Sequence, residues 1–225
     1  MSKLFHLIGT SVFLLLGATT LNAQFFFGQP NNPFITINVG FLSTPQLVDV
    51  DGDGYLDLIS GEENGSILFY KNNGNDNYVQ QTGGNNPFNG INVGFFSTPH
   101  LADVDGDGHL DLISGEELGR ILYYKNNGSN SFTQQTGVNN PFNSIDVGFV
   151  SNPVMVDLNG DGHLDLIVGN ENGNIRYYEN NGSNSFTQQT GGSNPFNGID
   201  VGFISTPVIV DLNRDGALDL IVGNE

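Results

Sequence analysis

The 225-residue sequence contains no cysteine and no tryptophan, and only six of its residues are lysine or arginine. Without cysteine, disulfide bonds cannot stabilise the chain, so packing or a bound metal has to do so. So few basic residues form no basic patch for nucleic-acid phosphates, which argues against nucleic acid as a partner. No segment shows the apolar period of 3.6 residues that marks a helix, so the pattern favours an all-β fold.

The N-terminal residues have the composition of a secretory signal peptide. Lys3 is followed by an apolar run from Leu4 to Gly17 and then by small residues up to Ala23. We expect residues 1–23 to be removed after Ala23, leaving a mature chain of residues 24–225. A membrane anchor is the alternative, but the run is shorter than the ~20 residues that a span needs, and no later stretch is long enough. The predicted location is secreted or at the cell surface.

A nine-residue segment occurs four times, starting at Asp49, Asp103, Asp157 and Asp211. Each copy has oxygen-bearing side chains at positions 1, 3, 5 and 9 and glycine at position 6. Calcium takes six to eight oxygen ligands, and loops of alternating Asp and Asn supply them. Glycine at position 6 allows a positive φ, and leucine at position 8 is expected to anchor the loop in a core. The segment therefore predicts a calcium site in each repeat, four sites in all.

The side chains at positions 1, 3, 5 and 9 and the backbone carbonyl at position 7 are the predicted ligands. In chain order these residues are Asp49, Asp51, Asp53, Tyr55, Asp57, Asp103, Asp105, Asp107, His109, Asp111, Asp157, Asn159, Asp161, His163, Asp165, Asp211, Asn213, Asp215, Ala217 and Asp219. Ordinary Asx turns are the alternative interpretation, since Asp, Asn and Gly also favour loops. Turn chemistry alone does not require four neighbouring carboxylates, which repel one another unless a cation neutralises them.

The acidity of the chain is concentrated in these four loops. They hold fourteen of the 24 acidic residues, while the net charge of the whole sequence is −18. The third and fourth loops carry Asn159 and Asn213 at position 3, and Arg214 lies inside the fourth. Counting charges within the loop therefore predicts weaker calcium binding at the third and fourth loops. Glu63, Glu117, Glu171 and Glu225 are candidates for the second shell of the ions.

The loops are spaced by 54 residues, which is the mark of a repeat architecture. Each unit predicts four short strands, at 46–48, 58–60, 66–71 and 78–81 in the first unit, followed by a link over residues 82–98. Four strands per unit with a constant link indicate a β-propeller. We place the units at about 31–84, 85–138, 139–192 and 193–225, the last one incomplete.

The pattern Asp-x-[Asp/Asn]-x-Asp-Gly-x-x-Asp followed by Leu-Ile-x-Gly resembles the FG-GAP/VCBS repeats. These are the calcium-binding β-propeller repeats of integrin α chains and of many bacterial surface proteins. The resemblance covers nearly all of the mature chain and implies one calcium per blade and a role in adhesion or recognition of a protein or glycan. The Phe-Gly and Gly-Ala-Pro signatures are absent, so the chain looks closer to the bacterial type.

The two ends of the sequence suggest an incomplete or truncated ring of about four blades. The chain stops at Glu225, just after the second strand of the fourth unit. Phe25 to Phe27 fall 54 residues before Val79 to Gln81, in register with a fourth strand. One strand would still be missing from a complete fourth blade. We therefore expect the sequence to be a piece of a longer protein.

Three sets of aromatic residues recur in register. They are Phe34, Phe88, Phe142 and Phe196; Phe41, Phe95, Phe149 and Phe203; and Tyr70, Tyr124 and Tyr178. Packing between blades is the favoured explanation, because buried rings dominate core energetics. Stacking on a glycan is the alternative, which the absence of tryptophan weakens.

We predict that the chain is not an enzyme. His100, His109 and His163 have no neighbour at zinc-ligand spacing and no recognisable nucleophile. The pairs Glu62–Glu63 and Glu116–Glu117 are interpreted as solvated turn residues, since adjacent strand residues point to opposite faces. Two alternatives remain: a catalytic or non-catalytic part of a larger secreted polysaccharide-degrading enzyme, and a purely structural surface repeat.

Overall fold

The computed structural model describes residues 32–40, 42–75 and 77–225. The predicted signal peptide and the segment from Phe25 to Phe27 lie outside these ranges. The chain divides into two units, Met1–Ile37 and Asn38–Glu225. In the first unit, the described residues 32–37 form turns, in which the Ile37 amide donates to the Phe34 carbonyl at 3.0 Å. Within the described ranges, no helix has the length and apolar character to cross a bilayer.

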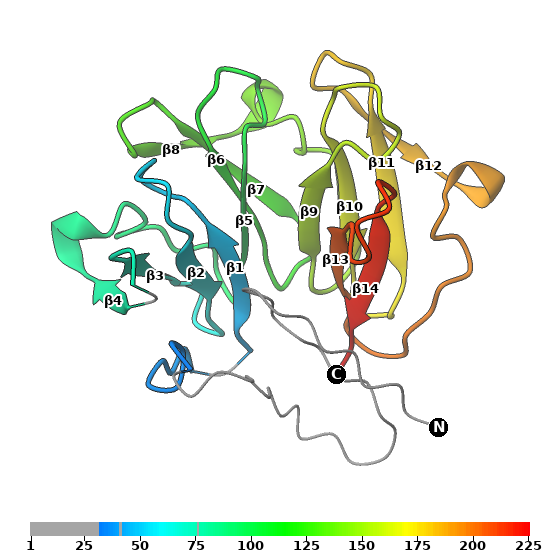
Figure 1. Cartoon of the computed structure of the whole chain (residues 1–225). Helices are drawn as coiled ribbons and strands as arrows, with labels where there is room; N and C mark the ends of the chain where they lie inside the picture. The colour runs from blue at the N-terminus through cyan, green and yellow to red at the C-terminus, as the bar shows by residue number, and fades with distance from the viewer. Residues whose placement is uncertain (1–31, 41, 76) are drawn as a thin grey trace, which may run out of the picture. The chain divides into compact units, whose positions relative to one another are not determined.

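The second unit consists of antiparallel sheets, one for each repeat (Figure 1). The first repeat forms β1 (Thr44–Val48), β2 (Asp57–Gly61), β3 (Ile67–Asn72) and β4 (Tyr78–Gln81), hydrogen-bonded in that order. The second and third repeats follow the same plan, with β5 (Thr98–Ala102), β6 (Asp111–Gly115), β7 (Ile121–Asn126), β8 (Phe132–Gln135), β9 (Asn152–Val156), β10 (Asp165–Gly169), β11 (Ile175–Asn180) and β12 (Phe186–Gln189). The prediction of four strands per unit is confirmed for these three repeats.

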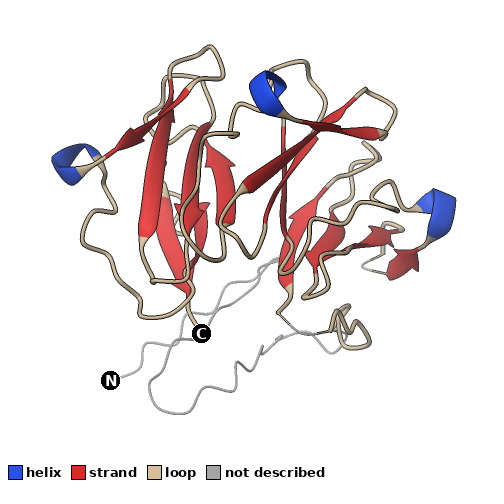
Figure 2. Ribbon diagram, turned by 180° about the vertical axis from the view of Figure 1, so that it is seen from behind, coloured by secondary structure: helices blue, strands red, loops and turns tan. Residues whose placement is uncertain are grey.

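The fourth repeat contributes two strands, β13 (Thr206–Val210) and β14 (Asp219–Gly223), which pair with each other. Three short 3₁₀ helices lie in the links, η1 (Gly83–Asn85), η2 (Gly137–Asn139) and η3 (Gly191–Ser193) (Figure 2). The all-β prediction is thus confirmed. The described residues show no closed ring of sheets, so the number of blades stays a prediction.

The hydrophobic cores lie between consecutive sheets. In β6, Leu112 belongs to the cluster shared with the first repeat, whereas Ile113 belongs to the cluster shared with the third. Side chains of a strand alternate between its two faces, so a strand covered on both faces is buried at every position. The strands β2, β6 and β10 are buried throughout, while β14 is only half-buried. Each repeat therefore depends on its neighbours for its core.

The junction between consecutive repeats is held by a buried serine. The Ser97 hydroxyl donates to the Ser66 carbonyl at 2.7 Å and accepts from the Glu62 amide at 2.8 Å. Ser151 and Ser205 make the same bonds at the next two junctions. The first strands of the sheets are also adjacent, and the Gln46 amide group bonds both the N–H and the carbonyl of Leu101. These bonds fix each sheet against the next and so position the loops at both ends of the strands.

Candidate functional site

Each acidic loop connects the first and second strands of its sheet and is wound around its first aspartate. Asp49 Oδ1 accepts the amides of Gly52 and Asp53 at 2.8 and 3.1 Å, and Asp49 Oδ2 accepts the amide of Gly54 at 2.8 Å. The same bonds recur around Asp103 and Asp157. Positive φ angles are needed at the sixth position, and Gly54 has a φ of 88°. The predicted role of this glycine is confirmed.

The carboxylate at position 9 is the buried end of the loop. Asp57 is fully buried; its Oδ1 accepts the Asn72 amide at 2.8 Å and its Oδ2 accepts the Val50 amide at 3.1 Å. Burial raises the pKa of Asp57 above its ordinary value. A carboxylate has about four lone-pair sites, so each oxygen keeps one for another partner. A cation placed in the loop would offset the cost of keeping this buried group charged.

Tyrosine strengthens this buried end in the second and third repeats. The Tyr123 hydroxyl donates to Asp111 Oδ2 at 2.8 Å, and the Tyr177 hydroxyl donates to Asp165 Oδ2 at 2.9 Å. Burial, followed by the bond to Asp111, raises the pKa of Tyr123. Phe69 stands at this position in the first repeat and has no hydroxyl to offer. The sequence analysis did not single out these tyrosines, although their 54-residue spacing was visible.

The predicted ligands converge in the first two loops. Oxygens of Asp49, Asp51 and Asp57 lie within 4.8 Å of one another, and so do the equivalent oxygens of Asp103, Asp105 and Asp111. Two oxygens bound to one Ca²⁺ at 2.3–2.6 Å lie at most ~5 Å apart. The donor set is also made of oxygen alone, which suits a hard cation. The residues present therefore fit a calcium ion.

A lysine ammonium already provides positive charge at these two loops. Lys71 Nζ forms ion pairs with Asp51 and with Asp53 Oδ2, the latter at 3.0 Å. Lys125 Nζ does the same with Asp105 and with Asp107 Oδ2, again at 3.0 Å. The predicted position-5 ligands Asp53 and Asp107 are thus joined to position 3 through the ammonium. The sequence analysis missed both lysines, because they lie 20 residues after the aspartates that they contact.

The third and fourth loops differ from the first two. In the third, the Asn159 side-chain amide donates to Asp161 Oδ2 at 3.0 Å, and position 9 is Asp165. In the fourth, the Asp215 amide is bonded by Asp211 and by Asn213. The lists of contacts around Asp219 and Ala217 are shorter: the Leu212 amide donates to Asp219 Oδ2, and the Ala217 amide donates to Asp215 Oδ1.

The residues at positions 7 and 8 have different surroundings from one loop to the next. The Tyr55 ring lies against Gly74, and the imidazoles of His109 and His163 lie against Gly128 and Gly182. Position 7 thus packs on the turn between the third and fourth strands. Leu110 and Leu164 pack against the core clusters, as predicted for position 8. For Leu56 and Leu218 that prediction is wrong, since both side chains are exposed.

The three sets of aromatic residues separate into two buried sets and one exposed set. Phe88, Phe142 and Phe196 are buried, and so are Tyr70, Tyr124 and Tyr178. Packing explains these rings, as predicted. By contrast, Phe95, Phe149 and Phe203 are 59%, 53% and 49% exposed. Packing therefore does not account for this set, which we call the exposed phenylalanine series.

The backbone holds this series at the junctions between repeats. The Phe95 carbonyl accepts the Glu117 amide at 2.9 Å, and the amide of the next residue, Phe96, donates to the Glu63 carbonyl at 3.0 Å. Phe96 has a φ of 60°, and Val150 and Ile204 at the same position have φ values of 51° and 44°. β-Branched residues avoid this region, and such strain costs about 1–3 kcal/mol per residue and concentrates at functional sites. A cavity of about 370 Å³ adjoins Phe95 and is lined by Gly40, Glu62, Glu63 and Asn64.

The glutamates near these turns require two corrections. The second strand carries the chain ~17 Å away from the acidic loop, so Glu63, Glu117 and Glu171 lie at the opposite end of the sheets from the predicted ions. Glu116, which was expected to be solvated, is buried and forms an ion pair with Arg120 at 3.1 Å. Its carboxylate also accepts the Arg120 amide at 3.0 Å. It stabilises a turn and is not free to act on a ligand.

Comparison with known proteins gives one family and one fold. The family model described as FG-GAP-like repeat matches residues 49–114, 103–168 and 157–222. No match was found among curated proteins. Among solved structures, the chain is similar to a lectin of Agrocybe aegerita that recognises non-reducing terminal N-acetylglucosamine, with 22% identity and a TM-score of 0.50. The match covers 80% of this chain and 46% of the lectin chain, so the sequence spans about half of that structure's length.

Proposed function

The chain belongs to the FG-GAP-like repeat family, and from this premise we propose that it is a calcium-stabilised, non-catalytic recognition module that binds a repetitive glycan. Calcium occupies the acidic loops at one end of the sheets. The exposed phenylalanine series binds the ligand at the other end. The observation that carries the recognition role is the exposure of Phe95, Phe149 and Phe203 at one position of three successive repeats.

The calcium in this proposal has a structural role. The four predicted ligand side chains of the first loop come from both ends of the β1–β2 connection, so one ion would tie β1 to β2. Bound calcium at about a hundredfold above its dissociation constant stabilises a fold by about 2.7 kcal/mol per site. Loose sites suit extracellular calcium, with dissociation constants of about 10⁻⁴–10⁻³ M. We accordingly place the mature chain, residues 24–225, outside the cell.

The exposed phenylalanine series supplies the chemistry of a sugar site. An apolar ring face stacks on the C–H face of a pyranose, while carboxylate and amide groups bond its hydroxyls. Phe95 has such groups beside it, since Glu62, Glu63 and Asn64 line the same cavity. Fixing the ring in a strained turn reduces the entropy lost on binding. The fold shared with a glycan-binding lectin supports the same class of ligand.

Repetition of the series favours a ligand that itself repeats. Single rings contribute about 0.5–1.5 kcal/mol each, which is too little for tight binding at one site. Three equivalent sites on one scaffold gain avidity when a polymer or a dense glycan surface contacts them together. We therefore expect weak binding of a monosaccharide and much tighter binding of a multivalent display.

Binding to a glycan array and to immobilised polysaccharides tests the proposal, with terminal N-acetylglucosamine displays included. Replacing Phe95, Phe149 and Phe203 together by serine should weaken binding at least tenfold. Val79→Thr is the matched control, because Val79 is exposed and Thr133 and Thr187 occupy its position in the next two repeats. Unchanged binding by the triple variant would refute the role of the series. Loss of binding by the control as well would show only general damage.

A further inference from the structure

The residue in the fifth position of the third strand differs between otherwise matching repeats. It is Lys71 in β3, Lys125 in β7 and Glu179 in β11. Lys71 and Lys125 reach back to the acidic loops and pair with the carboxylates at positions 3 and 5. Each ammonium therefore lies among oxygens that the calcium ion would use.

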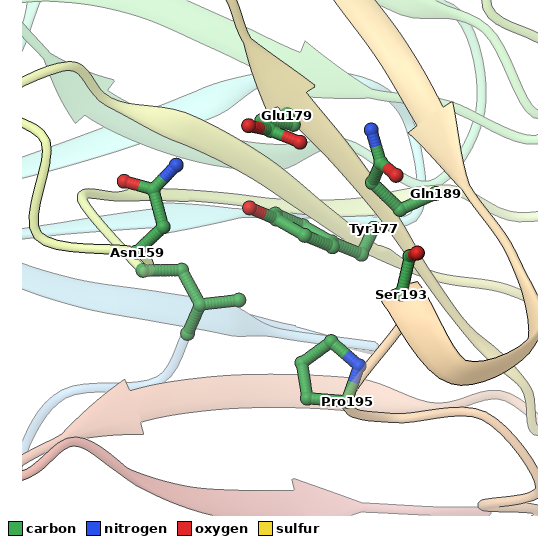
Figure 3. A pocket seen from close by; sticks show the side chains of 7 residues that line it. Asn159, Tyr177, Glu179, Gln189, Ser193 and Pro195 are labelled. Carbon is green, nitrogen blue, oxygen red and sulfur yellow. The ribbon is translucent and has the colours of Figure 1, made fainter.

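The third repeat presents an open space where the first two present a lysine. Asn159 and Glu179 line one cavity of about 300 Å³, together with Tyr177 and residues of β12 and the following link (Figure 3). Position 3 and the fifth strand position thus face the same cavity, as they face each other through an ion pair in the first two repeats. Asn159 has instead turned its amide to Asp161.

The charges at the second and third sites differ by one ammonium. Asp103, Asp105, Asp107 and Asp111 give four carboxylates beside Lys125. Asp157, Asp161, Asp165 and Glu179 give four carboxylates with no lysine in that position. The two loops are otherwise alike, since each has histidine at position 7 and a tyrosine bonded to position 9. The charge count of the loop alone, which ranked the third site below the second, leaves out this strand residue.

We propose that Lys71 and Lys125 are built-in competitors for calcium, so that the third loop fills first and the first two loops fill only when calcium displaces the ammonium. The inference rests on the proposed calcium function and concerns its regulation. Calcium entering the second loop has to break two ion pairs and to stay near a displaced positive charge. Calcium entering the third loop meets neither obstacle. An exposed ion pair is worth ~0.2–1 kcal/mol, so we expect the two sites to differ by about tenfold in affinity.

Two histidines allow the second and third loops to be followed separately. The His109 amide donates to Asp107 Oδ1 at 3.0 Å, and the His163 amide donates to Asp161 Oδ1 at 2.9 Å. The sequence contains four histidines, so labelling only histidine with ¹⁵N gives at most four amide signals. Titrating the metal-free protein with Ca²⁺ at constant pH should shift the His163 signal at a calcium concentration about tenfold below that for His109.

Exchange variants test the cause of this order. Asp105→Asn with Lys125→Glu gives the second loop the residues of the third, and Asn159→Asp with Glu179→Lys does the reverse. The first pair should tighten the second site about tenfold and the second pair should weaken the third site by a similar factor. Lys125→Met, which removes the ammonium without adding a carboxylate, should tighten the second site in the same direction. Circular dichroism confirms that each variant is folded.

The outcomes distinguish this inference from the function on which it rests. Equal midpoints in the native protein, an earlier shift of His109, or variants that leave the order unchanged would overturn the competition while leaving calcium binding intact. If neither amide shifts in millimolar calcium, the proposed calcium function itself fails. A tenfold separation that reverses with the exchange variants would establish the lysines as competitors.

Discussion

The junction between repeats provides a sharp prediction, because a glycine at the end of the second strand lies against the backbone of the next repeat. A Cβ added to Gly61 would overlap the Ser97 carbonyl oxygen, and one added to Gly115 would overlap that of Ser151. These glycines lie outside the left-handed region, so the constraint is space and not φ. Gly61→Ala or Gly115→Ala must push two sheets apart. We expect each to lower the free energy of unfolding by about 2–3 kcal/mol, in the range of overpacked cores.

Gly223 is the internal control for this prediction. It ends the second strand of the fourth repeat, and an added Cβ would meet the Thr206 Oγ1 atom at 2.7 Å and no backbone atom closer than 3.9 Å. A hydroxyl on a rotatable side chain can move, so Gly223→Ala should change the free energy of unfolding by no more than ~0.5 kcal/mol.

Urea unfolding followed by circular dichroism measures both effects, and thermal unfolding provides a second readout. For a chain of this size, 2–3 kcal/mol corresponds to a fall in Tm of about 4–12 °C. If Gly115→Ala and Gly223→Ala have the same effect, the contact between repeats does not constrain the sheet as the structure indicates. A stabilising effect of Gly115→Ala would refute the reasoning outright.

Three further predictions concern buried polar groups. Tyr123→Phe removes the hydroxyl bond to Asp111 and should cost about 1–2 kcal/mol in urea unfolding; no loss would show that the bond contributes nothing. Burial lowers the pKa of His100 to about 4, so the unfolded chain takes up a proton between pH 6.5 and 4 that the folded chain does not. Stability should therefore fall across that interval, and His100→Gln should flatten the fall in a pH series of unfolding curves; an unchanged slope would contradict this. Burial raises the pKa of Asp57 and Asp111, so protons compete with calcium above the ordinary carboxyl range, and the gain in Tm from calcium should be smaller at pH 4.5 than at pH 7. A gain independent of pH would indicate that these carboxylates do not bind the ion.

Much of the fold was predictable because each repeat states its strands locally. The alternation in residues 58–60 and the turn at Gly65 define β2 and β3 without any tertiary information. The 3₁₀ helix at Gly83–Asn85 was not predicted, since three residues are too few to show a period. The exposure of Leu56 was not predictable either, because it depends on whether another sheet covers that face.

The candidate site divides along the same line. The spacing of Asp49, Asp51 and Asp57 within nine residues shows by itself that their oxygens converge. The lysine that contacts Asp51 comes from another strand, so only the pairing of β2 with β3 brings it to the loop. Likewise, sequence could not separate Phe95 from Phe88, because both recur every 54 residues and their burial differs through packing alone.

The most direct test of the account is the stability of the protein with and without calcium. Metal-free protein should be unfolded by urea in EDTA and, in parallel, in millimolar Ca²⁺. We predict a gain of about 2.7 kcal/mol for each site held a hundredfold above its dissociation constant, with the unfolding midpoint rising accordingly. Identical unfolding curves in EDTA and in calcium would contradict the claim that the acidic loops are calcium sites.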